Sequence, residues 1–399
     1  MTAVRKMPLA PLVGCFGVFV TMGLLVSTLG PLLPGIRAEF GVGPQDAGLL
    51  VSAVPLGCIA GTLIVLFLNR RFHARVLLAA TGVTMAVGLV GAATTPSWWL
   101  VCGSLVIVGM GYGAATALVN GVIAVAYGSR SAGLLNLLNG VFGVAAVVGP
   151  FVVSGLAGGL PGLPPRFAYL PYVLVAIFSA VLVSRLPTGF STIPEGAAAP
   201  EVLADSPSRG PVRNTQLQSY GRLALVAAML GSYVATEVAA SSFATTHLLA
   251  AGADAGTAVR ATSLFYVGLA GGRLLVVPVA ARIGAGRLML GCAGLAAGLL
   301  VVTWALPLGG FTYLLVGAAM GPIFPTALAW VSGQGLGRDA LPIALTAANI
   351  GGLILPPIIG AVIGAVGATA APLPMAASVA ISALLISYLL FSARRSSVK

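Results

Sequence analysis

Residues 49–75 read LLVSAVPLGCIAGTLIVLFLNRRFHAR, an uncharged apolar run that ends in a segment carrying Arg70, Arg71 and Arg75. The hydrocarbon core of a bilayer is about 30 Å thick, and a helix needs about 20 apolar residues to cross it. Basic residues collect in the loops on the cytoplasmic side of a membrane. The stretch therefore predicts a transmembrane helix followed by a basic cytoplasmic loop.

The composition of the whole chain agrees with this local pattern. Of 399 residues, 58% are hydrophobic and only 7% are charged, and the mean hydropathy is +1.06. A soluble domain carries roughly 25% charged residues, so we expect lipid to cover this surface. The net charge of +12 comes from basic residues scattered between apolar runs, which form no basic face, and no nucleic-acid partner is expected.

Cutting the chain at its charges and Pro/Gly clusters predicts an all-α membrane protein with twelve transmembrane helices. The expected spans are 10–34, 46–68, 76–95, 98–127, 132–157, 168–186, 221–249, 257–280, 287–306, 309–332, 341–366 and 371–393. With the N-terminus in the cytoplasm, sixteen Lys and Arg residues fall on the inner side and three (Arg37, Arg166 and Arg260) on the outer side. This bias predicts a multi-pass protein of the cytoplasmic (inner) cell membrane with both termini cytoplasmic.

A long polar stretch and an internal repeat divide the chain. Residues 187–219 lack apolar periodicity and predict a cytoplasmic linker between two six-helix halves, 1–186 and 220–399. An offset of about 207 to 212 residues aligns Gly61 with Gly272, Gly109 with Gly317, and Arg130 with Arg338. Two pseudo-symmetric six-helix halves are what a parallel-repeat transporter requires, with its substrate held between them near the midplane.

The chain lacks the motifs of membrane enzymes and ATP-driven pumps. Its four cysteines lie in apolar runs without CxxC spacing, and His73 and His247 are far apart at span ends. No GxxxxGK[ST] sequence occurs. We expect no enzymatic activity, no cofactor and no metal site.

The loops after the second and eighth spans carry a resemblance to the major facilitator superfamily. Gly272-Arg273 followed by Arg282-Ile283-Gly284 and Arg287 is similar to that superfamily's loop motif, whereas residues 69–75 lack its Asp and Gly. The resemblance implies gating roles for Arg70, Arg71, Arg273 and Arg282. The alternative for the first loop is that its arginines only set the topology.

Within the superfamily, the chain is similar to the fucose/proton symporter group, which includes bacterial glucose and galactose carriers. The segment Tyr233-Val234-Ala235-Thr236-Glu237-Val238 resembles that group's Tyr-Val-Gly-x-Glu-Val segment. Residues 139–150 and 351–357 are similar to its fifth and eleventh helices. A Gly-Pro pair in the fifth span also occurs in drug/proton antiporters of the superfamily.

Glu237 is the one acidic residue placed deep in an expected span. An ionised carboxylate in hydrocarbon costs several kcal/mol, so this group is expected to be protonated, paired or facing a wet cavity. The functional interpretation is proton or substrate binding, and the alternative is a structural hydrogen bond to a neighbouring helix. Arg273 lies about 13 Å along the helix from Arg282, where it can pair with Glu237, close an inner gate or extend to the interface.

Polar and aromatic side chains elsewhere in the spans extend the candidate substrate site. The candidates are Asn120, Asn136, Asn139, Thr346 and Asn349, with Trp330 and Tyr266 as stacking surfaces. Amides bind hydroxyls well, which suits a sugar or another polyol. The alternative for each amide is a hydrogen bond between helices.

These observations predict a secondary transporter that takes up a small polar solute with protons, with a sugar as the favoured substrate. Within transport, the alternative is proton-driven export of a drug-like or secondary-metabolite solute. From a different class, a membrane receptor without transport remains open. The expected partners are the small-molecule substrate, protons and the lipid bilayer, and a monomer is expected.

Overall fold

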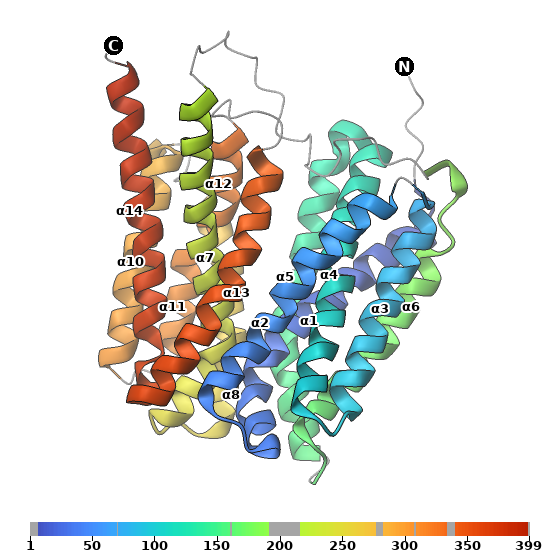
Figure 1. The fold of residues 1–399 in the computed structure, drawn as a ribbon, viewed down its shortest axis with the longest axis horizontal. Helices are drawn as coiled ribbons and strands as arrows, with labels where there is room; N and C mark the ends of the chain where they lie inside the picture. The colour runs from blue at the N-terminus through green and yellow to red at the C-terminus, as the bar shows by residue number, and fades with distance from the viewer. Residues whose placement is uncertain are drawn as a thin grey trace. The chain divides into compact units, whose positions relative to one another are not determined.

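The computed structural model describes residues 7–69, 71–159, 162–190, 216–276, 282–306, 309–332 and 340–397, and these residues contain helices and no strands (Figure 1). The chain divides into two compact units, Met1–Val202 and Leu203–Lys399. Each unit has its own set of packed helices and is described by itself.

The first unit contains six long helices and three short 3-10 turns. The helices are α1 (Leu9–Phe40), α2 (Pro44–Leu68), α3 (Ala74–Thr94), α4 (Trp98–Tyr127), α5 (Ser131–Gly159) and α6 (Leu170–Val183). The turns are η1 (Gly128–Arg130), η2 (Pro165–Tyr169) and η3 (Thr188–Phe190). Helix α1 packs on α5 and α6, α2 packs on α4, and α3 packs on α4 and α6.

The second unit repeats several of these pairings. Its helices are α7 (Gln216–Ala250), α8 (Ala255–Leu275), α10 (Ala285–Ala305), α11 (Phe311–Met320), α12 (Ile323–Ser332), α13 (Ala340–Val366) and α14 (Pro372–Ser397), with a turn η5 (Ala368–Ala370). Helix α7 packs on α13 and α14, α8 packs on α11, and α10 packs on α11 and α14.

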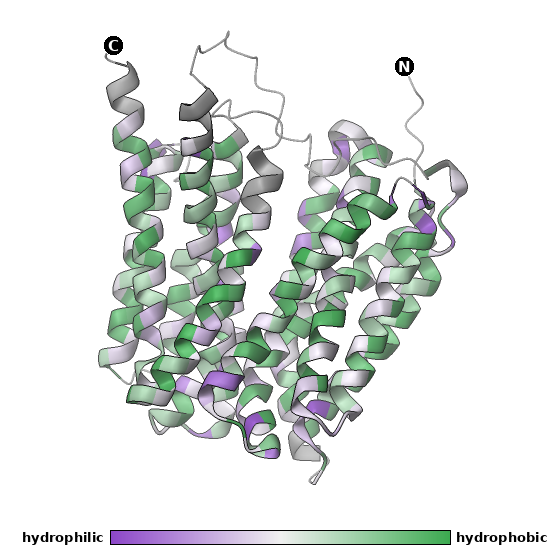
Figure 2. Cartoon of the chain, in the orientation of Figure 1, coloured by the Kyte–Doolittle hydropathy of each residue, from purple (hydrophilic) through white to green (hydrophobic). Residues whose placement is uncertain are grey.

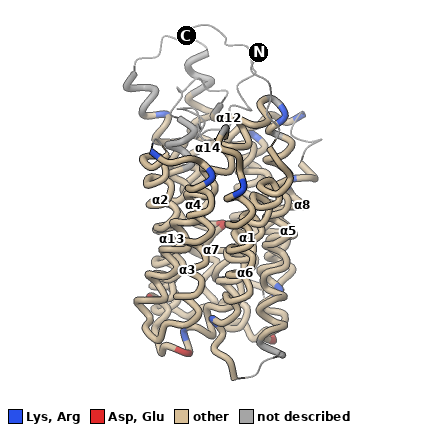
Figure 3. The backbone as a smooth tube through the Cα atoms, turned by 90° about the vertical axis from the view of Figure 1, so that its right-hand side faces the viewer, with Lys and Arg blue, Asp and Glu red and all other residues tan. Residues whose placement is uncertain are grey.

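Eleven helical segments in the described part of the chain are long and apolar enough to cross a membrane. Apolar residues run along most of their length (Figure 2), while the Lys and Arg positions lie mostly towards helix ends (Figure 3). Helix α8, which corresponds to the expected eighth span at 257–280, is not among the eleven. It carries Arg260 and Arg273, and residues 277–281 after it lie outside the described part.

Three expected boundaries differ from the structure. Helix α1 contains Pro31 and Pro34 and continues past both to Phe40. It ends at Gly41, which has a left-handed conformation with φ 62°. The tenth span is divided into α11 and α12 at Gly321-Pro322. Helix α7 begins at Gln216, inside the expected 187–219 linker, of which residues 191–215 lie outside the described part.

Glycines set the closest helix crossings in both units. A Cβ atom at Gly61 would lie 2.0 Å from the carbonyl oxygen of Met110, and one at Gly113 would lie 2.2 Å from that of Cys58. In the second unit, a Cβ at Gly272 would lie 2.1 Å from the oxygen of Ala318. The α2–α4 and α8–α11 pairs therefore need these glycines, because any side chain would separate the backbones.

Candidate functional site

Glu237 lies near the middle of the membrane span Gly221–Ala250 and is partly buried. One turn earlier on α7, Tyr233 is completely buried, and its ring stacks on Phe324 of α12 at 6.1 Å. The Tyr233 hydroxyl interacts with both Glu237 and Arg273. It forms no hydrogen bond of ordinary geometry with either side chain. A carboxylate, a guanidinium and a buried phenol therefore meet inside the second unit.

Arg273 lies in the last turn of α8, where its Nε donates a hydrogen bond of 3.3 Å to the carbonyl oxygen of Gly321. No ion pair joins Arg273 to Glu237. The sequence left pairing, gating and extension to the interface open for Arg273, and the structure shows it bonded to the break between α11 and α12.

Tyr266 lies on α8 and is 3% exposed. Its hydroxyl interacts with Ser241 and, more weakly, with Glu237 and Arg273. Of the residues predicted to form the site, the structure thus brings together Glu237, Tyr266 and Arg273. Tyr233 joins them, although the sequence singled it out only as part of a motif. Its spacing of one helical turn from Glu237 was the available signal.

Hydroxyl groups hold α7 in position on two sides. Towards α14, Ser232 and Ser382 share a hydrogen bond of 2.6 Å, and Ser378 donates to the Ser232 carbonyl at 2.9 Å. Towards α8, Thr245 donates to the Ala258 carbonyl at 3.2 Å, and Thr262 to the Ser241 carbonyl at 3.3 Å. These contacts fix the rotation of α7 about its axis and hence the direction of the Glu237 side chain.

The predicted amides are distributed over several helices. In the first unit, Asn120 on α4 is partly buried, while Asn136 and Asn139 on α5 are exposed. Asn139 donates to the carbonyl of Leu135 in its own helix at 2.8 Å. In the second unit, Thr346 on α13 is exposed, and Asn349 and Trp330 are partly buried. No hydrogen bond joins Asn120 to the amides of α5.

Two of the basic loop residues predicted to act in gating lie at the surface. The side chains of Arg71 and Arg282 are exposed, and Arg70 lies outside the described residues. The described residues also contain no cluster of three or more His, Cys, Asp or Glu side chains that could bind a metal ion.

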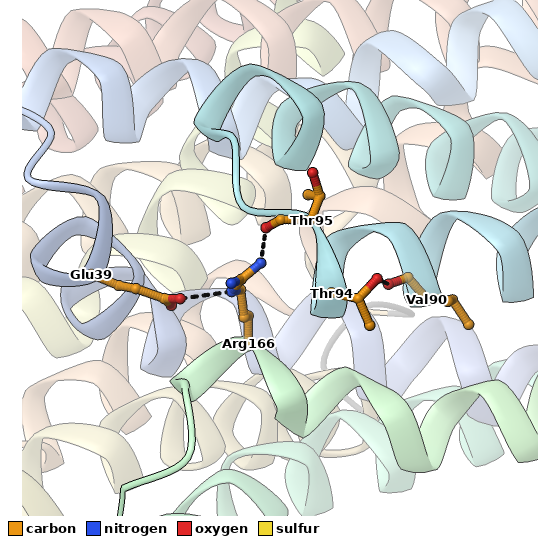
Figure 4. Close-up of polar contacts among 5 residues, drawn as sticks. All are labelled: Glu39, Val90, Thr94, Thr95 and Arg166. Carbon is orange, nitrogen blue, oxygen red and sulfur yellow. Dashed lines mark hydrogen bonds and ion pairs between the residues drawn. The ribbon is translucent and has the colours of Figure 1, made fainter.

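A polar cluster at the ends of α1 and α3 was not recognised in the sequence, where Arg166 served only as a topology signal. Arg166 of η2 donates from Nε to Glu39 of α1 at 2.8 Å and from Nη1 to the carbonyl of Thr95 (Figure 4). Its guanidinium also lies 5.1 Å from the ring centroid of Phe40, which packs edge-on against Trp98 at 5.9 Å. A single side chain thus connects η2 with the ends of α1 and α3.

The profile of the Major Facilitator Superfamily matches residues 15–335. This range is more than half of the chain, so the chain belongs to the Major Facilitator Superfamily and is a multi-pass membrane transporter. The resemblance predicted from the loop motif and from the Tyr233–Val238 segment is confirmed.

The individual proteins to which the chain is similar include sugar carriers and a nucleoside transporter. A D-xylose transporter of Levilactobacillus brevis is 38% identical over 84 residues, which cover 21% of this chain and 18% of that transporter. The structure is similar to a D-xylose-proton symporter (17% identity, 94% of this chain and 96% of that chain, TM-score 0.74). It is also similar to the E. coli fucose:proton symporter FucP (18%, 95% and 98%, TM-score 0.59) and to the nucleoside transporter NupG (15%, 95% and 99%, TM-score 0.71).

Proposed function

We propose that this chain is a secondary transporter that takes up a sugar or a similar polyol together with protons by alternating access. The observation that carries the proposal is the group formed by Glu237, Tyr233 and Arg273 at membrane depth. Glu237 binds the proton or the substrate in this proposal, and Arg273 responds to its charge.

The chemistry of a carboxylate in this position supports a proton-binding role. The ionised form is disfavoured in a bilayer unless a positive group or water is near, whereas the protonated form is a neutral hydrogen-bond donor. Arg273 is close enough to interact with the same phenol as Glu237 but forms no ion pair with it. The carboxylate can therefore change its protonation state without breaking an existing salt bridge.

A polyol substrate is supported by the side chains available and by the relatives. Asn120, Asn136, Asn139, Thr346 and Asn349 offer amide and hydroxyl groups, and Trp330 and Tyr266 offer aromatic surfaces for a sugar ring. The local match to a D-xylose transporter and the fold shared with two sugar/proton symporters agree with this substrate class. The fold shared with NupG makes nucleosides the comparison substrates in a transport assay.

The remaining parts of the proposal concern topology and assembly. We infer two pseudo-symmetric six-helix halves, 1–186 and 220–399, joined by a cytoplasmic linker at 187–219. The glycine crossings of α2–α4 and α8–α11 and the repeated helix pairings support this repeat. In this proposal the protein lies in the inner cell membrane with both termini in the cytoplasm, and it is a monomer. Labelling of single cysteines in the linker from outside intact cells would contradict this topology.

The proposal is tested in proteoliposomes with labelled D-xylose, L-fucose and a nucleoside, with and without an inward proton gradient. A substrate of the wild-type protein is expected to accumulate only with the gradient. Glu237→Gln keeps the size of the side chain but fixes it in a neutral state, so exchange of substrate across the membrane is expected to continue while accumulation stops. If Glu237 binds the substrate as a charged acceptor, binding itself weakens by about 1.5 to 3 kcal/mol.

A matched control and two contrary results complete the test. Thr94→Ala removes an exposed hydroxyl of the first unit, which donates to the Val90 carbonyl of its own helix, and leaves gradient-driven accumulation in place. Accumulation by Glu237→Gln with the pH dependence of the wild type would show that the carboxylate is structural. Outward, proton-driven movement of an apolar dye without uptake of any sugar would favour the exporter.

A further inference from the structure

Two prolines interrupt the hydrogen bonds of the tenth span. In an α-helix, each carbonyl accepts a hydrogen bond from the N–H group four residues later. The helical partner of the Ala318 carbonyl would be Pro322, and that of the Gly321 carbonyl would be Pro325, but proline has no N–H group. Both carbonyls lose their partners where α11 ends at Met320 and α12 begins at Ile323.

Two adjacent residues of α8 lie against these carbonyls, Gly272 against that of Ala318 and Arg273 against that of Gly321. Gly272 approaches the Ala318 oxygen so closely that a Cβ atom would lie 2.1 Å from it. The neighbouring Arg273 donates from Nε to the Gly321 oxygen at 3.3 Å. Arg273 therefore occupies the position of the N–H group that Pro325 lacks, and an otherwise unpaired carbonyl at membrane depth would cost several kcal/mol.

Glu237 lies one helical turn after Tyr233, the phenol that also interacts with the Arg273 guanidinium. Tyr233 interacts with both groups, and its ring stacks on Phe324 in the first turn of α12. The Arg273 side chain thus has two acceptors available, the Gly321 carbonyl and the Glu237 carboxylate. An ionised carboxylate attracts the guanidinium as a charge as well as a hydrogen-bond acceptor, whereas a neutral carbonyl offers only the hydrogen bond.

We propose that Arg273 is a positioning residue that makes the break in the tenth span respond to the protonation state of Glu237. When Glu237 is protonated, the guanidinium stays on the Gly321 carbonyl and closes the break. When Glu237 is ionised, its carboxylate draws the guanidinium away, and the carbonyl between α11 and α12 loses its partner. This inference deepens the proposed function, because it depends on Glu237 changing its protonation state.

Among the described residues, few titratable side chains lie near Glu237 on α7 or on the helices packed against it. On α8, they are Arg273 and Tyr266, and on α7, Tyr233. Helix α11 contributes Tyr313, which is bonded to His247 instead, while α12 and the described part of α13 carry none. On α14, Tyr388 is exposed, and Arg394 and Arg395 lie near the helix end. A pH effect at the break is therefore assigned to Glu237.

The test measures amide hydrogen exchange of the α12 segment in the purified full-length protein, without any substrate. Rates are corrected for the intrinsic pH dependence of amide exchange and compared at mildly acidic and mildly alkaline pH. In the wild type, exchange is expected to rise towards alkaline pH. Arg273→Gln is expected to show fast exchange at both pH values, roughly tenfold above the acidic wild type, the factor for losing one hydrogen bond.

Two further variants separate positioning from a general loss of stability. Glu237→Gln is expected to keep slow exchange at both pH values. Pro325→Ala restores an N–H group that can bond to Gly321, so Arg273→Gln combined with Pro325→Ala is expected to return to slow exchange without pH dependence. A Glu237→Gln variant with the pH dependence of the wild type, or a double variant that stays fast, would overturn the proposal.

The exchange pattern is independent of transport. If it appears as expected while no sugar is accumulated, the proposed substrate class is wrong and the role of Arg273 stands. If sugar is accumulated with protons but exchange does not respond to Glu237→Gln, the role of Arg273 is wrong and the proposed function stands.

Discussion

The Nε atom of Arg166 donates a hydrogen bond of 2.8 Å to the carboxylate of Glu39, which lies 127 residues earlier in the chain. The two side chains are 9% and 22% exposed. Together with the bond from Arg166 to the Thr95 carbonyl, this ion pair ties the end of α1 to η2 and to the end of α3. The ion pair therefore joins three segments of the first unit that are far apart in the sequence.

Replacement of Arg166 by Gln is expected to destabilise the first unit by about 2 to 3 kcal/mol. Removing one partner of a buried pair costs up to about 5 kcal/mol, but water still reaches Glu39 and lowers that penalty. The measurement is thermal unfolding in detergent, with Glu39→Gln and the double variant completing a cycle. Arg260→Gln is the control, because Arg260 is exposed and interacts with the exposed Asp254 and the Thr257 hydroxyl at the surface. Equal losses for both arginine variants would show that the ion pair adds nothing.

Alanine at Gly61 or Gly272 is expected to destabilise the protein by about 1 to 3 kcal/mol each, the usual cost of overpacking. The new Cβ would lie 2.0 Å from the Met110 oxygen or 2.1 Å from the Ala318 oxygen, so the helices must separate. Gly103→Ala on α4 is the control, because nothing lies within 4 Å of its Cβ position. That variant is expected to be neutral or more stable, since alanine favours helix over glycine by up to about 1 kcal/mol.

Much of this fold follows from the sequence because a bilayer restricts each helix to a narrow range of lengths. Spans such as 98–127 coincide with α4, and the glycines that the internal repeat aligns lie at the α2–α4 and α8–α11 contacts. The division at Gly321-Pro322 was missed because proline is tolerated inside membrane helices, as Pro150 in α5 shows. Whether a proline breaks a helix depends on which neighbour bonds to the freed carbonyl.

The candidate site was less predictable than the fold. Glu237 was identified from the cost of burying a charge, which requires only the sequence. Arg166 and Glu39 were not paired, because nothing in the sequence around either residue indicates which charges meet. The exposed amides on α5 were predicted from spacing, but spacing does not show which face of a helix is buried.

The acidic limit of stability is expected to depend locally on Asp254, the N-cap of α8. Hydrogen bonds from the Thr257 side chain and backbone N–H lower the pKa of Asp254. Because the pKa is lowered on folding, the stabilisation is complete above the unfolded value of about 3.9 and is lost as the pH falls through the folded value. Amide exchange in the first turn of α8 is expected to rise with acid in the wild type. Asp254→Asn, which keeps a capping oxygen but does not titrate, is expected to remove this dependence; a wild-type acid response in the variant would exclude Asp254.

Asn139→Ala is expected to weaken the apparent affinity for the transported sugar more than it weakens folding. The side chain is exposed, and its amide nitrogen bonds only within α5, so little packing is lost. Lost hydrogen bonds to a neutral solute correspond to about 0.5 to 1.5 kcal/mol each. Uptake kinetics and unfolding temperature are compared for the same preparation. A lower unfolding temperature with an unchanged Michaelis constant would assign Asn139 to structure.

The last prediction concerns the Tyr233 hydroxyl group, whose removal is expected to impair proton coupling without lowering stability. Tyr233 is fully buried, and its hydroxyl has no hydrogen-bond partner of ordinary geometry, although it interacts with Glu237 and Arg273. An unpaired buried hydroxyl costs about 1 to 3 kcal/mol, so Tyr233→Phe is expected to be as stable as the wild type or more stable. The same change removes the polar group that interacts with both Glu237 and Arg273, so proton-driven accumulation of sugar is expected to fall roughly tenfold, which corresponds to about 1.4 kcal/mol of lost interaction. Tyr313→Phe is the matched control, because its hydroxyl lies 3.3 Å from Nδ1 of His247, and its loss is expected to lower stability while the proton dependence of uptake is retained. A Tyr233→Phe variant that unfolds earlier but accumulates sugar like the wild type would mean that this phenol only supports packing.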